Sequence, residues 1–454
     1  MSNLSFSISV DQAGTRKIAS AWLQLGLVAL LLAGFFSVLL VLSRTPGMQN
    51  LLPLKDFFKV ALIIHVNLSV LIWFLAFAGV FWSLSSIKQP RIWDYTALAL
   101  AVLGTLIIVL TPFAGDGEPL MNNYVPIINH AWFFKGLLFF VAGMICILLR
   151  TLFTNLPPLR PQTGEQLLHF AIYIAAISAM TALAAFIASY LGTPKVLTPE
   201  LYNEILFWGV GHIMQFTHTQ LMLVAWLILA FAIGVNIRIS ADWGTVLFII
   251  VLAPLIVVPL IYLSYQSFFP QHIAAFTELM RLGGLGAIPL GSLILFWIIK
   301  SARTPKSKPH LKAALYWSIS LFAAGGLVGF LIKGSNVMIP AHYHGCTVGV
   351  TLAFIGITYY LLPKLGYAEP NVKWATLQSW FYGGGQLIHI IGLAWSGGYG
   401  VQRKAVGAAQ TLDRLPEVLG MGMMGLGGLL SIIGGFLFLL VAYKAMFDSK
   451  PKLI

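Results

Sequence analysis

The sequence predicts an all-α protein that crosses a membrane with twelve helices, and three observations carry this prediction. Of the 454 residues, 59% are apolar and 9% are charged, and the mean hydropathy is +0.88. So few charges cannot solvate the surface of a water-soluble globule. The apolar residues also form long runs, and the Lys and Arg residues gather in the short segments between these runs.

The apolar runs are long enough to cross about 30 Å of hydrocarbon. In chain order, the twelve predicted spans are 19–43, 59–85, 93–113, 130–150, 166–192, 205–235, 243–269, 283–300, 313–333, 342–363, 375–396 and 417–445. The first run is longer than a signal-peptide core, so we expect it to remain as the first helix. No loop is long enough for an independent soluble domain. We therefore expect a cytoplasmic segment at 1–18, a membrane domain at 19–445 and a cytoplasmic tail at 446–454.

The basic residues predict the orientation of the chain. Seventeen of the 27 Lys and Arg lie at the two ends or in the even-numbered connections, which predicts that both termini face the cytoplasm. The net charge is +13, but the basic residues that produce it lie in short loops, as orientation signals do, and form no solvated basic face. This excludes a nucleic-acid-binding protein. The two cysteines, Cys146 and Cys346, lie in apolar runs and can build no disulfide framework, haem-attachment motif or thiolate metal cluster.

Histidines inside the predicted spans are the main functional candidates, because an ionisable side chain in a membrane is costly. His65 and His212 lie near the outer ends of the second and sixth spans, and His272 ends the seventh. His342 and His344 lie in the first turn of the tenth span. Five histidines from four helices therefore converge on one outer level. The alternative for any single histidine is a structural bond to a neighbouring carbonyl.

The spacing in His342-Tyr343-His344 indicates which metal centres these two histidines could serve. The two imidazoles are about 200° apart around a helix, so they cannot bind one metal ion but can serve two centres. Neutral imidazole is the usual axial ligand of haem iron, and a bis-histidine haem needs a second histidine at the same height on another helix. His65 lies at that height.

Four segments carry a family resemblance. The tenth span reads AHYHGCTVGVTLAFIGITYYLLPK, the second HVNLSVLIW, the sixth WGVGHIMQF and the seventh YQSFFPQH. Together they resemble the catalytic subunit I of the haem-copper oxygen reductases, and the resemblance extends over essentially the whole chain. The pattern is most similar to the C-type cytochrome c oxidases and the related nitric oxide reductases. It implies a twelve-helix bundle of the subunit I type.

The resemblance also implies roles for the five histidines. His65 and His344 would bind a low-spin haem, expected to be b-type, and His342 would bind a high-spin haem. His212 and His272 would bind the metal that faces the high-spin haem. That metal is copper in the oxidases and non-haem iron in the nitric oxide reductases.

Three positions bear on whether the chain is similar to an oxidase or to a nitric oxide reductase, and one of them departs from the pattern of both. Gln271 stands where the family has a further metal-binding histidine, and an amide oxygen is a poor copper ligand. Phe216 stands where many oxidases have a tyrosine and nitric oxide reductases a glutamate. Tyr265 matches the helix-VII tyrosine of the C-type oxidases and is our catalytic candidate. Its seven-residue separation from His272 predicts two helical turns and a shared face; the alternative is an ordinary packing tyrosine.

The outer loops hold weaker candidates. Arg403 and Lys404 match a basic pair near the haem propionates in relatives; the alternative is a solvated loop. Asp116 and Glu118 match a calcium site that some relatives have, although two acids in a loop are usually just solvated. Hydroxyl groups on the seventh to ninth spans, such as Ser318, are candidates for a proton path from the cytoplasm, or simply pack.

Three classes of function remain. The favoured one is a terminal respiratory reductase that reduces dioxygen to water, with reduction of nitric oxide to nitrous oxide as the alternative. A haem protein without a working second metal is the second class, and a secondary transporter the third, although its charged or broken-helix features would be expected at the midplane. The reductase is expected in the bacterial inner membrane. It needs a partner subunit with a copper centre or a c-type haem as electron donor, because the chain lacks both.

Overall fold

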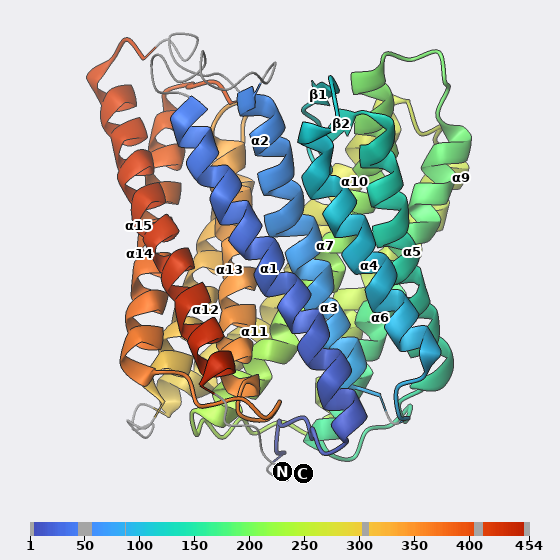
Figure 1. The fold of residues 1–454 in the computed structure, drawn as a ribbon, viewed down its shortest axis with the longest axis vertical. Coiled ribbons are helices and arrows are strands. Elements are labelled where there is room, and N and C mark those ends of the chain that lie inside the picture. Colours follow the sequence, from blue (N-terminus) through green and yellow to red (C-terminus); the bar gives the residue numbers. More distant parts are fainter. Residues whose placement is uncertain (1–3, 44–56, 87, 302–307, 404–411, 449–454) are drawn as a thin grey trace. The chain divides into compact units, whose positions relative to one another are not determined.

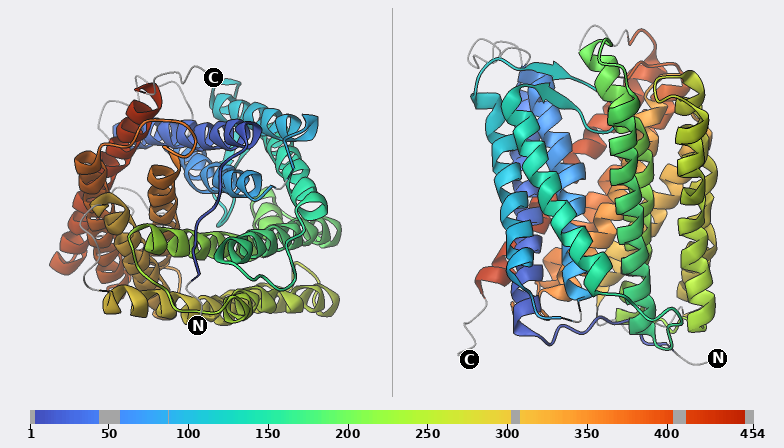
Figure 2. Two further views of the ribbon diagram at one scale, coloured as in Figure 1. Left: turned by 90° about the horizontal axis from the view of Figure 1, so that it is seen from below. Right: turned by 90° about the vertical axis from the view of Figure 1, so that its right-hand side faces the viewer.

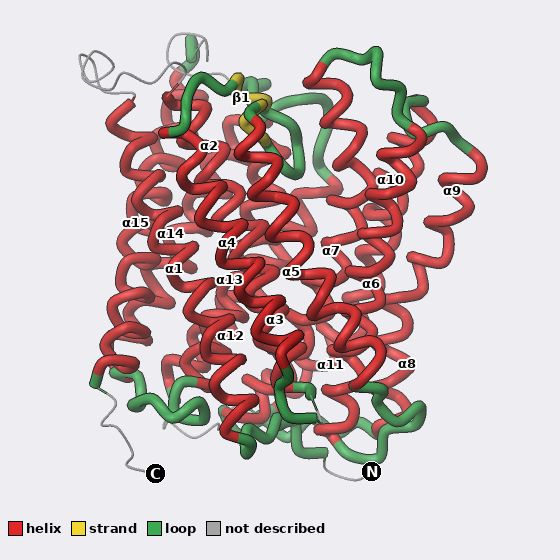
Figure 3. The backbone as a smooth tube through the Cα atoms, turned by 45° about the vertical axis from the view of Figure 1, so that its right-hand side comes forward, coloured by secondary structure: helices red, strands yellow, loops and turns green. Residues whose placement is uncertain are grey.

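The computed structural model describes residues 4–43, 57–86, 88–301, 308–403 and 412–448. Helices account for most of these residues, and the described strands form one short antiparallel hairpin (Figures 1 and 3). Its strands are β1 (Glu118–Leu120) and β2 (Ile127–Asn129), with Pro119 opposite Ile128. The all-α fold class predicted from composition is confirmed.

The chain divides into two compact units. The first unit comprises Met1–Val224 and Arg238–Leu293, and the second comprises Ala225–Ile237 and Ile294–Ile454. The first contains α1 (Ala13–Ser43), α2 (Phe57–Val66), α3 (Trp73–Leu84), α4 (Ile92–Leu110), α5 (Ala131–Thr154), α6 (Gly164–Gly192), α8 (Ala241–Leu252), α9 (Val258–Ser264) and α10 (Pro270–Gly283). The second contains α12 (Pro309–Phe330), α13 (Met338–Leu361), α14 (Val372–Gly398) and α15 (Leu415–Phe447). Helices α7 (Pro199–Ala232) and α11 (Ala287–Lys300) belong partly to each unit.

Eleven helical segments in the described ranges are long and apolar enough to cross a membrane. Helix α14 is long enough, with 27 residues, but less apolar than these. It carries a glycine triplet at 383–385 together with Gln378, Gln386 and His389. The predicted count of twelve spans is therefore approximately right, and α14 owes its lower hydropathy to polar and small residues.

The predicted seventh and eighth spans have wrong boundaries. The seventh, predicted as 243–269, ends at Ser264, and the eighth begins at Pro270, not at residue 283. Proline at the first helical position has its φ already set for a helix and needs no partner for the missing N–H. His272 therefore lies in the first turn of the eighth span.

Small residues set the close contacts within each unit. In the first unit α1 packs beside α3 (Figure 2), where Trp73 covers Gly26 and Trp22 covers Gly79. In the second unit a side-chain carbon at Gly325 of α12 would lie 2.5 Å from the backbone nitrogen of Cys346 in α13. The glycine-rich stretches of α14 and α15 also contact each other through their backbones.

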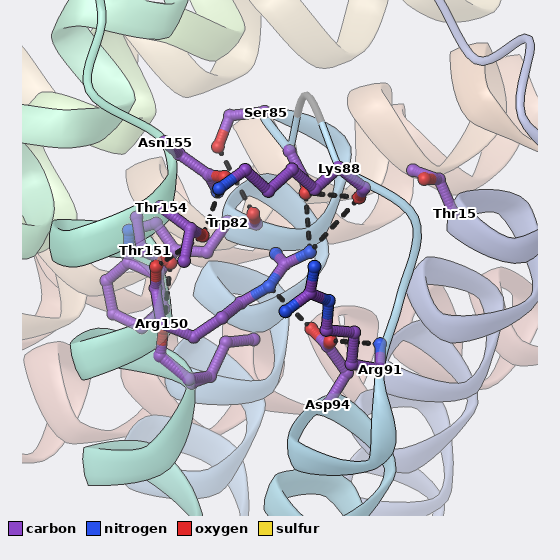
Figure 4. Close-up of polar contacts among 12 residues, drawn as sticks. Thr15, Trp82, Ser85, Lys88, Arg91, Asp94, Arg150, Thr151, Thr154 and Asn155 are labelled. Carbon is purple, nitrogen blue, oxygen red and sulfur yellow. Dashed lines mark hydrogen bonds and ion pairs between the residues drawn. The ribbon is translucent and has the colours of Figure 1, made fainter.

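A buried ion pair joins α4 to α5 in the first unit (Figure 4). Arg150 Nε lies 2.9 Å from Asp94 Oδ1, and the Asp94 side chain is 2% exposed. Asp94 Oδ2 also accepts a 2.8 Å hydrogen bond from the backbone N–H of Arg91 and so caps the start of α4. The Arg150 guanidinium donates further to Ser86 Oγ and to the Lys88 carbonyl. The ion pair between Asp94 and Arg150 therefore connects the start of α4, the end of α5 and the loop between α3 and α4.

Candidate functional site

His342 lies on α13 and is oriented by α12. Its Nδ1 is 2.7 Å from the carbonyl oxygen of Gly325. Because a carbonyl only accepts, Nδ1 carries the proton and Nε2 keeps the lone pair that a metal needs. Gly329 leaves room for the ring, since a side-chain carbon there would lie 2.7 Å from Nδ1.

His344 faces a different helix from His342, as their separation around the helix axis predicts. Its ring meets that of His389 on α14 edge to face, with centroids 4.8 Å apart. The Nδ1–H of His389 in turn donates to the carbonyl of Met424 on α15, at 2.8 Å. The two histidines of the H-x-H motif are therefore held by separate sets of neighbours.

His65 lies at the end of α2 and is fixed by α1. Its Nδ1 is 2.9 Å from the carbonyl oxygen of Ala33, so Nε2 again carries the lone pair. A π-helical turn, Asn67–Ile72, follows at once, a conformation found often at functional sites. Asn67 Nδ2 donates to the carbonyls of Ile63 and Pro126, which holds this turn in place. His65 belongs to the first unit and His344 to the second, and their pairing on one haem stays a prediction.

His212 on α7 also has its Nδ1–H bonded to a backbone carbonyl, and its other ring nitrogen is hydrogen-bonded too. Its Nδ1–H donates to the carbonyl of Trp208 at 2.8 Å, and its Nε2 accepts from the hydroxyl of Tyr124 at 3.0 Å. Tyr124 lies in the loop between β1 and β2. Burial of the hydroxyl and the negative charge of Glu204 raise the pKa of Tyr124, so it keeps its proton and donates.

His272 on α10 lies fully buried among aromatic rings. The centroids of Tyr262 and Phe276 are 4.9 Å and 5.0 Å from its own. The nearest polar group to the His272 ring is the backbone of Tyr265, at the limit of hydrogen-bond geometry, so at least one of its ring nitrogens is buried without a hydrogen bond. The Phe276 ring also contacts His212, with centroids 6.1 Å apart. An imidazole nitrogen buried without a partner is costly, and a bound metal or ligand would satisfy it.

These side chains fit haem ligation better than a copper site. The haem candidates His65 and His342 each donate Nδ1–H to a backbone carbonyl, which fixes the ring and presents Nε2, the arrangement typical of metal-binding histidines, and His212 does the same. In contrast, the described residues contain no group of three or more His, Cys, Asp or Glu placed to hold one metal ion. His212 and His272 alone do not supply the three imidazoles of the copper pattern.

A comparison of the sequence with models of protein families identifies the family of this chain. The family model for cytochrome C and quinol oxidase polypeptide I matches residues 17–437. The chain belongs to this family. It is therefore a membrane-embedded member of the haem-copper oxidoreductases, a superfamily that in general holds haems and a second metal.

Individual relatives within this oxidase family are distant. An uncharacterized protein of Rickettsia prowazekii is 29% identical over 515 residues, covering 97% of this chain and 98% of its own. The cytochrome c oxidase subunit 1 of Thermus thermophilus is 22% identical, covering 96% of this chain and 86% of its own. Among solved structures, a heme-copper terminal oxidase dimer studied by cryo-EM is similar in fold. It has a TM-score of 0.75 at 18% identity and covers 96% of this chain and 85% of that one.

The shared helical face predicted for Tyr265 and His272 is wrong. Helix α9 ends at Ser264, and Tyr265 is extended (φ −135°, ψ 131°) and 40% exposed. The tyrosine that packs on His272 is Tyr262, whose hydroxyl donates to the Ala185 carbonyl at 3.0 Å and lies 2.8 Å from Ser189 Oγ. Gln271 is exposed, whereas its neighbour His272 is buried, so their side chains point to different sides of α10.

The remaining candidates are in part structural. Arg403 Nε donates to Ser335 Oγ at 3.1 Å, and Lys404 lies outside the described residues. Asp116 lies in the irregular segment before β1, and Glu118 opens β1. Ser318 donates to the Gly349 carbonyl and accepts from Trp226 Nε1, so its hydroxyl is hydrogen-bonded between packed helices, and its place in a proton path stays a prediction.

Sequence reasoning missed Tyr124 altogether. A loop residue has no periodicity that could place it beside a helix. The only signal is Gly211, directly before His212, where a side-chain carbon would lie 2.0 Å from the Tyr124 ring.

Proposed function

We propose that this chain is the catalytic subunit I of a terminal respiratory reductase that reduces dioxygen to water. The observation that best supports this is the hydrogen bonding that His65, His212 and His342 share. An imidazole with its Nδ1–H held by a carbonyl offers Nε2 to a metal in a fixed direction. Three such residues in a member of the oxidase family favour metal redox chemistry over transport.

The roles of the histidines follow the family resemblance. His342 would bind the high-spin haem, and His65 and His344 the low-spin haem, expected to be b-type. When bound, the haems supply electron transfer and an iron that can bind a gas. The chain's own contribution is orientation: the Gly325 carbonyl aligns His342, and the Ala33 carbonyl aligns His65.

The second metal, copper or non-haem iron, is proposed at His212 and His272. His272 supports this because it is fully buried and at least one of its ring nitrogens has no hydrogen-bond partner. The third ligand position of the family falls on Gln271, whose exposed side chain points away from His272. Because the donor set is one imidazole short, we assign no reaction step to this metal.

Nitric oxide reduction is the second candidate, and the incomplete imidazole set favours it. Copper prefers imidazole, whereas non-haem iron accepts mixed nitrogen and oxygen ligands. A haem protein with no working second metal is the third candidate. The experiment is haem and metal analysis of the purified complex, followed by turnover with each gas. We expect one low-spin and one high-spin haem and faster turnover of dioxygen; turnover of nitric oxide alone, or of neither gas, would reject the proposal.

Electrons must come from a partner subunit. The chain has two cysteines, both free, which cannot form a two-copper thiolate centre or attach a c-type haem by the usual motif. A partner with either centre would supply this function at the outer side of the membrane, where Arg403 lies by prediction.

The low-spin haem gives a direct test of His65. We expect His65→Ala to remove the low-spin component of the visible spectrum completely and leave the high-spin component, because a bis-histidine haem loses one of its two axial ligands. His169→Ala is the matched control, since His169 has no assigned role, and it should keep both components. Retention of the low-spin band in His65→Ala would refute the assignment.

A further inference from the structure

A pocket of about 310 Å³ lies between the β1–β2 loop and the start of α7, within the first unit. Four of its six lining residues have oxygen atoms in their side chains. These four are Asn122, Thr198, Glu200 and Glu204, and Met121 and Leu201 complete the wall. The predicted orientation of the chain places the pocket at the outer side of the membrane. The pocket therefore offers oxygen atoms to a cation from the outer medium.

Two carboxylates lie on one face of α7 at this pocket. Glu200 and Glu204 are four residues apart, so their side chains are neighbours on the helix. Among the described residues, no basic side chain forms an ion pair with either one. Lys195, the nearest basic residue in sequence, instead lies over the Tyr190 ring, 5.9 Å from its centroid. The dipole of α7 favours a negative charge only in the first turn, which accounts for Glu200 but not for Glu204.

Asn122 supplies an observation that is independent of these charges. Its side chain is 8% exposed, and neither Oδ1 nor Nδ2 has a hydrogen-bond partner among the described residues. A buried amide with both atoms unpaired is costly and indicates a bound ion or water. The next residue, Asn123, donates its backbone N–H to Glu204 Oε2 at 3.0 Å and its side-chain amide to Oε1. This pairing holds Asn122 beside the carboxylates.

The oxygen donors of the pocket fit Ca²⁺ better than other metal ions. Ca²⁺ binds about six to eight oxygen atoms from carboxylates, amide carbonyls and water in flexible geometry, so it needs no third acidic ligand. Mg²⁺ demands a nearly ideal octahedron and gives up its water reluctantly. Zinc and copper prefer imidazole or thiolate, and no histidine or cysteine lines the pocket.

We propose that this pocket binds Ca²⁺ through Glu200, Glu204 and Asn122 and so ties the β1–β2 loop to α7. The site is distinct from the calcium position that the family resemblance suggests at Asp116 and Glu118, because neither of these residues lines the pocket. The same loop carries the tyrosine that bonds to His212, so bound Ca²⁺ fixes a loop that reaches the proposed active site. The proposal does not depend on the assignment of any histidine.

The test is the Ca²⁺ affinity of the chelator-treated, purified full-length protein in detergent, measured by isothermal titration calorimetry. We expect one Ca²⁺ per chain. Glu200→Gln keeps the size of the side chain and removes one ligand charge, so the affinity should fall about tenfold or more. Asp242→Asn is the matched control, because Asp242 is likewise an acid in the first turn of a helix, α8, and does not line the pocket. It should leave the affinity unchanged.

A second variant separates ligation from a structural role of the amide. Asn122→Leu is similar in size and removes both unpaired polar atoms. It should weaken Ca²⁺ binding, while the calcium-free protein unfolds at the same temperature as the wild type or higher, because an unsatisfied buried group is gone. A lower unfolding temperature without calcium would show that Asn122 has a structural role and would overturn its place as a ligand.

The remaining outcomes also decide the question. If the wild type binds no Ca²⁺, or if Glu200→Gln and Asn122→Leu bind it as the wild type does, the site is wrong. Loss of binding in Asp116→Asn but not in Glu200→Gln would place the ion at Asp116 and Glu118 instead. Equal affinity for Mg²⁺ would show an unselective acidic pocket and overturn the assignment to Ca²⁺.

Discussion

His342→Ala is expected to abolish gas binding and turnover. In the proposed arrangement His342 is the single protein ligand of the high-spin haem, and alanine leaves the iron without its imidazole. Carbon monoxide added to the reduced protein should shift part of the Soret band of the wild type and none of the band in the variant. Turnover of dioxygen should fall below detection.

His344→Ala is the control for this result. It should remove the low-spin component but keep the shift with carbon monoxide, because the two histidines face different helices. A milder variant tests orientation rather than ligation: Gly329→Ala would bring a methyl group to 2.7 Å from His342 Nδ1 and should reduce the shift. If His344→Ala abolishes the shift and His342→Ala keeps it, the two roles are reversed.

The spans could be predicted from the sequence because hydropathy depends on composition, which is local. The break between Ser264 and Pro270 was missed, although two signals mark it. Ser264, Gln266 and Ser267 interrupt the apolar run there, and Pro270 favours the first position of a helix and disfavours helical conformation in the residue before it. A helix continued through this break puts Tyr265 on the wrong face and hides the contact of Tyr262.

The site was predictable only where it depends on helix register. His342 and His344 face different neighbours, as two residues on one helix must. The Nδ1 partners of the histidines are carbonyls of other helices or of the preceding turn, which carry no sequence signal. Tyr124 depends on a loop packed across α7, and contacts of that kind come from tertiary structure alone.

Charge pairing was likewise hidden in the sequence. Arg150 is one of the basic residues on which the predicted orientation of the chain depends, and nothing in its local sequence indicates a partner. In the structure it is buried against Asp94, which lies far earlier in the chain on the neighbouring helix. The same residue can satisfy both requirements, because a charge needed for topology still has to be neutralised once the helices pack.

Asp94→Asn is expected to destabilise the protein by about 3–5 kcal/mol, because it leaves the Arg150 charge buried without a counter-charge. Asparagine is nearly the same size and can still accept from the Arg91 N–H, so the loss would report the charge and not the cap. The measurement is thermal or denaturant unfolding in detergent. Glu278→Gln is the matched control: its pair with Arg281 is at 3.4 Å with side chains 53% and 57% exposed, and such a pair contributes about 1 kcal/mol or less.

A double variant separates charge burial from lost packing. Asp94→Asn combined with Arg150→Met removes both charges and keeps a long side chain on α5, so it should recover part of the stability lost in Asp94→Asn alone. The recovery is expected because the cost lies in an unpaired buried charge, which the second substitution eliminates. If Asp94→Asn costs no more than Glu278→Gln, or if the double variant is less stable than the single one, the ion pair does not stabilise the junction of α4 and α5 in the way its burial implies.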